Sequence, residues 1–587
     1  MAEDFDLIVR GGTVLDGTGA DAATADVGVR AGRIAAVGRV DGDATEVVDA
    51  DGLLVTPGFV DIHTHYDGQV TWDSHVVPSA WHGVTTVVMG NCGVGFAPVR
   101  PADRERLIEL MEGVEDIPGA ALHEGISWEW ETFAEYLDAI DRRPHDIDVA
   151  AQVPHGAVRL YAMGERGADR APATEAEIAE MATIVGDAIG AGALGFTTSR
   201  TLNHRTSRGE PTPTLTAAED ELIGIARAMG EVDAGVIELI SDFDDLDSEF
   251  DRLRHMVEVS GRPLTISLSQ IDHKPQRWRE LLDRIERASA DGLDIRGQVA
   301  VRPIGVLLGL QASLNPFLAN PVYRELADLP LAERVAALRE PGVRERLLAA
   351  ARPTGEGGQR RFLFGQWDKM FPLEDPPDYE PDPAESVAAR AGREGREPEE
   401  VALDLLLADD GHALLYFPLF NYTDFDLDVA RQMLTHERTL IGLGDGGAHV
   451  GTICDASFPT TLLAHWGRDR DRGERLALPW IVRAYSAENA RAVGLHDRGV
   501  IAPGYKADLN VIDFGRVQAR RPEVAFDLPA GGKRFLQRAD GYVATVVAGQ
   551  VVYREGHHTG ALPGRLVRGA QPVPPAPRTD CTEEVPA

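Results

Sequence analysis

The sequence predicts an α/β protein, namely a (β/α)8 TIM-like barrel with a small β-sandwich domain formed from both chain ends. Two observations support this fold class. Apolar runs of strand length alternate with helix-like stretches through the middle of the chain, which is typical of a parallel sheet. Both ends instead carry short β-rich runs separated by Gly and Asp turn signals, which is typical of antiparallel strands.

The two chain ends are predicted to form one small domain. The first segment, DLIVRGGTVLDGTGADAATADVGVRAGRIAAVGRV, alternates apolar and polar residues between turn signals. The same texture returns in RGVIAPGYKADLNVIDF and GYVATVVAGQVVYREG near the other end. Because similar ends flank a different middle, we assign residues 1–56 and 496–556 to the β-sandwich and residues 57–495 to the barrel.

The middle segment supplies eight runs that fit barrel strands. They are GFVDIHTH, GVTTVVMG, DIDVAAQV, ALGFTTS, AGVIELIS, PLTISLSQ, DIRGQVAVRP and TLIGLGDGG, with helix-like stretches such as ATEAEIAEMATIVGDAIGAG between them. A ninth run, HALLYFPLFN, is assigned to an insertion at about residues 320–410, which is rich in Arg, Glu, Pro and Ala. Residues 557–587 form a Pro-rich tail that we expect to be extended or disordered, and its Cys581 is regarded as incidental.

Composition excludes several classes of partner. The chain has 587 residues, of which 43% are hydrophobic, so it can bury a deep site, and its three cysteines are too few for a disulfide framework. Its net charge of −36, with no basic tract, argues against nucleic acid and anionic membranes. No apolar run approaches the roughly 20 residues that cross a bilayer, and the start MAEDFDLIVR is acidic, unlike a signal peptide. We expect a cytoplasmic protein that acts on a small molecule, and a homo-oligomer is compatible with base rates.

Two histidines follow the first predicted barrel strand, one residue apart. Residues i and i+2 of a strand point to the same side, so His63 and His65 in VTPGFVDIHTHYDG are aimed at one point. In a barrel of this kind the active site lies at the C-terminal ends of the strands. The pair therefore predicts a metal site, and the alternative is a pair of buried, hydrogen-bonded histidines.

Several motifs together resemble the amidohydrolase superfamily. They are PGFVDIHTH after the first strand, GDGGAH after the last, and SAENARAVGLHDRGVIAPGYKADLNVID returning into the β domain. Within that superfamily, WHGVTTVVMGNCGVGFAPVRP and GALGFTTSR are similar to the N-acyl-D-amino-acid deacylase (D-aminoacylase) group, and the resemblance runs to about Gly556. It implies an amidohydrolase that acts on carbon-nitrogen bonds other than peptide bonds.

The resemblance also implies a metal site that holds one or two Zn²⁺ ions, or another divalent metal. In that group the residues matching His63, His65 and Cys92 are ligands, and the carboxylate matching Asp445 binds metal and moves the catalytic proton. Imidazole, thiolate and carboxylate suit zinc, and amide hydrolysis needs a water activated near neutral pH. The alternatives are a turn residue capping the next helix for Asp445, and a small buried residue in a tight turn for Cys92.

The sequence departs from this group on the fifth and sixth strands, where the group places a histidine each. The runs GVIELISDF and PLTISLSQIDHK carry no histidine in register, because the matching positions fall near Leu239 or Ile240 and near Leu268 or Ser269. Glu238 and His273 are candidate replacements. Their alternatives are a solvated loop charge and a loop histidine without a function.

Other strand-end residues are further candidates. His155 follows the third strand, His204 follows the fourth, and His449 lies four residues after Asp445. An Arg or Lys at the mouth of the site would bind a substrate carboxylate, and the candidates for this role are Lys274, Arg302 and Arg200. The HPR motif of the group has no counterpart in GTICDASFPTTLLAHWGRDR, where Cys454 is interpreted as a packing residue.

Three functions are compatible with these residues. The first is deacylation of an N-acyl-D-amino acid, or of a related linear amide, by a metal-activated water. The second is hydrolysis of a cyclic amide by a hydantoinase-like or dihydropyrimidinase-like enzyme, which would need a lysine that ALGFTTSR does not offer. The third is a non-catalytic protein with an amidohydrolase fold. We expect the first, because the GNCG motif is present and the resemblance covers nearly the whole chain. The third is disfavoured because His63, His65, Cys92 and Asp445 are all present.

Overall fold

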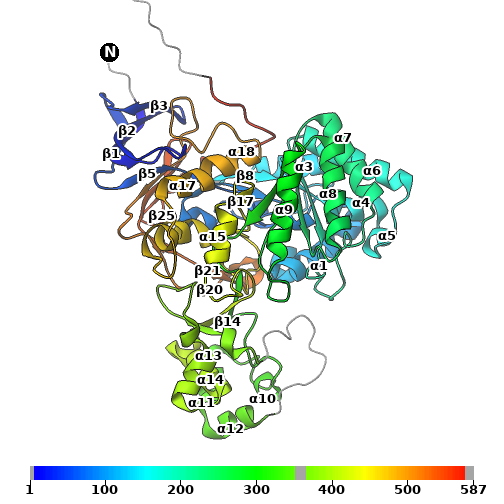
Figure 1. Ribbon diagram of the computed structural model, residues 1–587, viewed down its shortest axis with the longest axis vertical. Coiled ribbons are helices and arrows are strands. Elements are labelled where there is room, and N and C mark those ends of the chain that lie inside the picture. The colour runs from blue at the N-terminus through cyan, green and yellow to red at the C-terminus, as the bar shows by residue number, and fades with distance from the viewer. Residues whose placement is uncertain (1–4, 351–364, 576–587) are drawn as a thin grey trace, which may run out of the picture.

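The computed structural model describes residues 5–350 and 365–575 (Figure 1). Cys581 and the end of the predicted tail, residues 576–587, lie outside the described residues, as does part of the predicted insertion, residues 351–364. No helix in the described ranges has both the length and the apolar character needed to span a bilayer. The fold has mixed α/β content: the described residues form a nine-stranded sheet, a six-stranded sheet, two three-stranded sheets and two strand pairs, with helices packed around them.

Strands from both chain ends share one nine-stranded sheet. Its order is β25-β24-β23-β18-β5-β1-β2-β3, and β4 pairs with β1. The two ends meet where β5 and β18 run antiparallel, with Val55 opposite Val511, and both valines are fully buried. The bounds are β1 Phe5–Val14, β2 Ala23–Arg30, β3 Arg33–Gly38, β4 Ala44–Asp49, β5 Leu54–Pro57, β18 Leu509–Ile512, β23 Tyr542–Val547, β24 Gln550–Arg554 and β25 His557–His558.

The strand pairing of this sheet differs from the expectation in one respect. Strands β1, β2 and β3 are antiparallel, as the alternating pattern predicts, but β4 and β5 both pair with β1 in parallel. Two further antiparallel pairs form separate two-stranded sheets, namely β19 Gln518–Ala519 with β22 Ala539–Asp540 and β20 Glu523–Leu528 with β21 Gly532–Leu536. A sandwich of two facing sheets stays a prediction.

The eight predicted barrel runs all form parallel strands. One sheet has the order β6-β7-β8 and another the order β17-β13-β12-β11-β10-β9. The bounds are β6 Phe59–Asp61, β7 Val84–Met89, β8 Asp148–Ala151, β9 Val153–Pro154, β10 Gly195–Arg200, β11 Val236–Ser241, β12 Leu264–Ser267, β13 Ile295–Val299 and β17 Thr439–Ile441. Only Gln152 separates β8 from β9, and a parallel bridge joins Thr64, after β6, to Gly446, after β17.

Helices connect the parallel strands and lie outside them in Figure 1. The run ATEAEIAEMATIVGDAIGAG forms α6, Glu175–Gly190, which begins with a capping box between Thr174 and Glu177 and buries an apolar face against the strands. The other helices here are α1 Arg104–Glu115, α2 Gly119–Gly125, α3 Phe133–Asp141, α4 His155–Met163, α5 Glu165–Ala168, α7 Glu219–Val232, α8 Leu246–Ser260, α9 Arg277–Ala290, α15 Asp428–Leu434, α16 Phe458–Thr461, α17 Leu478–Arg483 and α18 Asn489–Ala492.

Between β13 and β17 the chain forms a separate lobe, drawn in green at the bottom of Figure 1. A three-stranded antiparallel sheet, β14-β16-β15, packs on its helices around its own apolar core. The run HALLYFPLFN becomes β16 of this sheet rather than a ninth parallel strand. The bounds are β14 Gly305–Gly309, α10 Pro321–Arg324, α11 Leu331–Arg339, α12 Pro341–Ala349, β15 Phe371–Leu373, α13 Val387–Glu394, α14 Pro398–Leu407 and β16 Leu414–Pro418.

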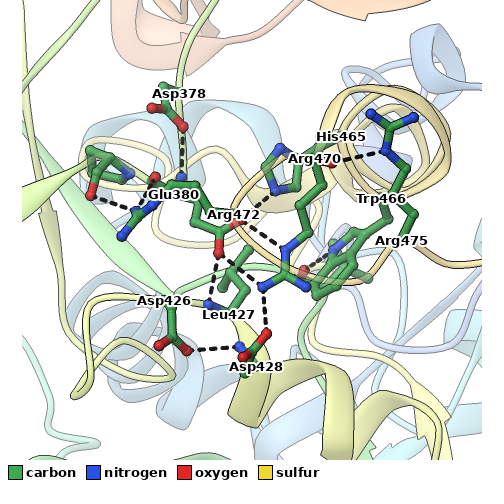
Figure 2. A network of polar contacts seen from close by, with 12 residues as sticks. Asp378, Glu380, Asp426, Leu427, Asp428, His465, Trp466, Arg470, Arg472 and Arg475 are labelled. Carbon is green, nitrogen blue, oxygen red and sulfur yellow. Dashed lines mark hydrogen bonds and ion pairs between the residues drawn. The ribbon is translucent and has the colours of Figure 1, made fainter.

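The lobe is wider than the predicted 320–410 because β14 and β16 pair with each other at its base. A buried ion cluster ties it to the segment after α16 (Figure 2). Glu380 accepts from Arg470 Nε and Nη2, both at 3.0 Å, and lies 2.9 Å from His465 Nε2. Because Glu380 and Arg470 are almost completely buried, each depends on the other for its neutralisation.

The segment after β25 differs in part from the expected tail. His145 pairs with Gly564, Val149 with Leu566, and Leu495 with Gln571 as isolated bridges. An extended conformation therefore holds for this stretch, but its backbone is bonded to β8 and to residues 494–496, beyond α18, rather than free in solvent.

Candidate metal and catalytic site

The histidine pair lies directly after β6, as the sequence predicts. His63 and His65 are 1% and 2% exposed, and their ring centroids lie 5.5 Å apart. The backbone N–H of His65 donates to Gly446 O at 2.8 Å, and that of Asp445 donates to His63 O at 2.9 Å. The loops after the first and last parallel strands are thereby held against each other.

Cys92 lies in a single 3-10 turn, Asn91–Gly93, after β7. Its motif is glycine-rich for a steric reason: Gly90 has φ +84°, and a Cβ there would lie 2.3 Å from Gln152 O. Cys92 itself has φ 55°, a conformation uncommon for a residue with a side chain. The turn directs Sγ inward to 3.4 Å from His63 Nε2. One ligand atom each from His63, His65 and Cys92 lies within 4.8 Å of the others.

Asp445 follows β17 and directs its carboxylate at the two histidines. Its Oδ1 lies 3.5 Å from His63 Nε2 and 3.8 Å from His65 Nε2. No described helix begins at this loop, which argues against the alternative of a helix cap. The neighbouring Gly444 is required by close approach, because a Cβ there would lie 2.4 Å from Asp61 Oδ2.

The other nitrogen of His63 is held by an amide that sequence reasoning missed. His63 Nδ1 donates to Gln298 Oε1 at 2.9 Å, and Gln298 Nε2 donates in turn to Thr265 Oγ1 at 2.9 Å. Gln298 lies on β13 and Thr265 on β12. Because Nδ1 carries the proton, the Nε2 lone pair faces Cys92 and Asp445 and is available to a metal.

Glu238 on β11 reaches the same place, as its candidate role requires. It is 1% exposed, and its Oε2 accepts the backbone N–H of Cys92 at 2.9 Å. Its Oε1 is buried and has no hydrogen-bond partner among the residues that the structure describes. Neither β11 nor β12 carries a histidine, so this carboxylate is the ionisable side chain that the fifth strand contributes.

A second buried carboxylate, Glu115, was not predicted. It ends α1, and its carboxylate lies 3.3 Å from His65 Nδ1 and 3.6 Å from His449 Nε2. The sequence does hold a signal, since Glu115 falls four residues after Met111 on the apolar face of the helix. A glutamate in that position is buried against its preference.

The electrostatics of the cluster favour a cation. Burial raises the pKa of Glu238 to about 8 and that of Asp67 to about 7. Burial, together with the neighbouring carboxylates, holds the pKa values of Glu115 and Asp445 well above their usual range. Burial lowers the pKa of His63 to about 4, so its ring is neutral. Neutral imidazoles, a thiol and carboxylates with unpartnered oxygens form a donor set that fits a divalent metal.

Two further predicted histidines lie near the cluster. His204 Nδ1 is 2.9 Å from Ser199 Oγ, and its charge would interact with His63 and His449. The side chain of His449 is 27% exposed, and its backbone has φ 48°. His449 is therefore more exposed than His63 and His65, which are 1% and 2% exposed.

His155 and His273 are not brought to the cluster by any contact. His155 is buried with Nδ1 2.8 Å from Thr198 Oγ1 and Nε2 2.9 Å from Glu221 Oε1, so both nitrogens are engaged. His273 is exposed on the turn after β12. Sequence position alone does not distinguish a strand-end histidine that faces the site from one that packs between strand and helix.

The three basic residues considered for substrate binding each have a carboxylate partner. Lys274 pairs with Asp244 at 2.6 Å, and Arg200 pairs with Glu249. Arg302 is 1% exposed, binds Asp455 at 2.9 Å, and lies 3.5 Å from the centre of the Tyr379 ring. These ion pairs neutralise the charges of all three side chains in the absence of a substrate.

Comparison with known proteins connects this geometry with chemistry. A sequence model described as "Amidohydrolase family" matches residues 46–553. N-acyl-D-aspartate deacylase of Alcaligenes xylosoxydans xylosoxydans is 32% identical over 97% of this chain and 96% of its own length. A structure of D-aminoacylase, described as having a binuclear metal centre, superposes with a TM-score of 0.64 at 25% identity and covers 96% of this chain and all of the other. N-acyl-D-glutamate deacylase from Bordetella bronchiseptica, complexed with zinc and a phosphonate inhibitor, gives a TM-score of 0.62 at 25% identity with the same coverage.

Proposed function

Because this chain belongs to the amidohydrolase family, we propose that it hydrolyses N-acyl-D-amino acids to a carboxylic acid and a free D-amino acid in a metal-dependent reaction. The observation that carries this proposal is the buried cluster of His63, His65 and Cys92, with Asp445 facing both imidazoles. Its ligand atoms come from the ends of three different parallel strands, and such convergence needs long-range folding rather than a local motif.

Zinc is the metal that this donor set suits best, since it combines thiolate and imidazole with carboxylate. His63, His65 and Cys92 would hold it, with Asp445 and Glu238 as the acidic groups beside them. A zinc ion held there would supply Lewis acidity for amide hydrolysis. The separate carboxylates of Glu238 and Asp445 are compatible with either one or two ions.

Asp445 is the group placed to move the proton. Its Oδ1 faces His63 Nε2 and His65 Nε2, and its side chain is 12% exposed, so a substrate can reach it. In the proposed reaction Oδ1 takes a proton from the attacking water and delivers it to the leaving nitrogen. Burial is the main cause of the raised pKa of Asp445, and this raised pKa is that of the carboxyl without a metal beside it.

We also propose that the parallel strands close into the predicted (β/α)8 barrel. The short step from β8 to β9 across Gln152 and the bridge between Thr64 and Gly446 support closure. Closure would put the ends of β6, β7, β11 and β17 around one axis, where barrels of this kind carry their active sites.

The proposal is tested with a panel of N-acetyl amino acids, half apolar and half acidic, each as D and L enantiomers. Protein reconstituted with zinc should release the free amino acid from at least one D substrate, detected by chiral chromatography. The L enantiomers and chelator-treated protein are the matched controls. Release from no member of the panel by zinc-loaded protein would contradict the proposed substrate class.

A further inference from the structure

Glu115 is a buried carboxylate for which the fold alone gives no reason. It is the last residue of α1, where the helix dipole disfavours a negative charge, and it is 1% exposed. In the described parts of the chain, neither Lys nor Arg pairs with it, because both of its ion contacts are to histidines. Burying a carboxylate without a basic partner costs stability, so another role must retain it.

The contacts of Glu115 lie on the side of His65 that faces away from the metal cluster. Oε1 is 3.3 Å from His65 Nδ1, whereas His65 Nε2 lies 3.8 Å from Asp445 Oδ1. The imidazole is thus flanked by two carboxylates, one at each nitrogen. Within the described ranges, neither His65 Nδ1 nor Glu115 Oε2 has a hydrogen bond of regular geometry, and contacts in such sites commonly shorten when the site is loaded.

We propose that Glu115 is a positioning residue, which accepts the Nδ1 proton of His65 and thereby presents Nε2 to the metal. This inference rests on the proposed function, since it assumes that His65 binds a metal. A metal-binding histidine usually donates its second N–H to such a partner, which fixes the ring and its tautomer. His63 has a neutral partner in the same position, Gln298, so the two histidines receive supports of different charge.

The second contact of Glu115 extends this role to the loop after β17. Oε2 lies 3.6 Å from Nε2 of His449, four residues beyond Asp445. One carboxylate therefore links α1, the HxH segment and the loop that carries Asp445. Removing it should loosen the metal cluster without breaking a backbone hydrogen bond, because the loops remain joined through His63 O and Gly446 O.

The test compares zinc affinity in Glu115→Gln, Glu115→Asp and the wild-type protein by competition with a chromophoric chelator. Glu105→Gln is the matched control, because Glu105 lies on the same helix but is exposed and pairs with His123. The amide oxygen of Glu115→Gln can still accept the Nδ1 proton of His65, but the negative charge that strengthens the hydrogen bond and raises the basicity of the ring is lost. We therefore expect Glu115→Gln to lose about 10- to 100-fold in zinc affinity, Glu115→Asp to recover part of the loss, and Glu105→Gln to match the wild type.

A spectroscopic measurement separates positioning from a merely structural role. The visible spectrum of the cobalt-substituted protein reports the ligand set, and it should change in Glu115→Gln while thermal unfolding of the metal-free variant stays close to wild type. Wild-type zinc affinity and an unchanged cobalt spectrum in Glu115→Gln would overturn the inference and leave the proposed function intact. Absence of zinc binding by the wild type would instead overturn the proposed function, and the inference with it.

If Glu115→Gln does not fold, the wild type provides the test. Histidine-selective ¹⁵N labelling of the zinc-loaded protein should show His65 as the tautomer protonated at Nδ1 and bound through Nε2, identified by the signal missing from His65→Gln. Coordination of His65 through Nδ1 would overturn the inference, since that nitrogen could not then donate to Glu115.

Discussion

The backbone N–H of Cys92 donates a hydrogen bond to Glu238 Oε2 at 2.9 Å, which joins the turn after β7 to a carboxylate on β11. Cys92 needs such support because its backbone has φ 55°. The second oxygen of Glu238 is buried and unpartnered. Glu238 can therefore act in two ways. One oxygen supports the Cys92 turn, and the other can bind a metal in place of the histidine that the resemblance led us to expect on this strand.

Replacing Glu238 with Gln separates these two roles. The amide oxygen can still accept the Cys92 N–H, but the negative charge is lost, so we expect zinc affinity to fall by about 10-fold or more. Isothermal titration with zinc measures the change, and Glu219→Gln on the exposed start of α7 is the control. An unchanged affinity in Glu238→Gln would restrict Glu238 to supporting the turn.

Cys92→Ser should bind zinc more weakly than the wild type, because a hydroxyl is a much poorer zinc ligand than a thiolate. Elemental analysis after dialysis against a dilute chelator gives the metal retained per chain. Cys454→Ser is the matched control, since Cys454 is also buried and burial raises the pKa of its thiol to about 12. Equal zinc in both variants would show that Cys92 is a packing residue.

Asp445→Asn should fold normally and lose about 10²- to 10⁴-fold in turnover, the range expected when a proton-transfer group is removed. The backbone contacts of residue 445 do not depend on its side chain, so circular dichroism should not change. The deacylation rate at saturating substrate checks the prediction. Turnover within a factor of about three of wild type would remove Asp445 from the mechanism.

Glu380 should stabilise the attachment of the lobe in a pH-dependent way. Burial opposes its charge, but His465 and Arg470 together hold its pKa at about 2, below its value of 4.5 when unperturbed. Since the folded state has the lower pKa, the stabilisation is complete above about pH 4.5 and is lost as the pH falls toward 2. That difference corresponds to roughly 3 kcal/mol of unfolding free energy.

Glu380→Gln tests this cluster by chemical denaturation at several pH values. At pH 7 the variant should be less stable by roughly 3 kcal/mol, because the exposed Asp428 is then the one carboxylate among the described residues that pairs with Arg470 (Figure 2). The difference should shrink as the pH is lowered from 5 to 3. A difference independent of pH would mean that packing, and not the charge of Glu380, holds the lobe.

The sequence was most informative where residues that can bind a metal lie at strand ends or in glycine-rich motifs. The i, i+2 spacing at a strand end predicted that His63 and His65 meet, whereas Cys92 and Asp445 were added through the resemblance of their glycine-rich motifs to the D-aminoacylase group. Glu115 was missed because its role depends on the distant His65 and not on its neighbours in α1. The predicted role of Arg302 in substrate binding stays a prediction. In the folded protein Arg302 pairs with Asp455, and its position at a strand end did not reveal that pair.

The strands, too, were predicted best where a local pattern in the sequence marks them. The parallel strands were recognised as apolar runs, and HALLYFPLFN was excluded from them correctly. The lobe reaches beyond about residues 320–410 because β14, Gly305–Gly309, pairs with β16, a long-range contact that no local pattern indicates.

The most direct test of the central claim is the rate of D-amino acid release measured against zinc bound per chain, starting from chelator-treated wild-type protein. We predict that the metal-free protein is inactive and that turnover rises with the first zinc bound by the cluster of His63, His65 and Cys92. Substantial turnover by protein that contains no bound metal, confirmed by elemental analysis, would contradict the account.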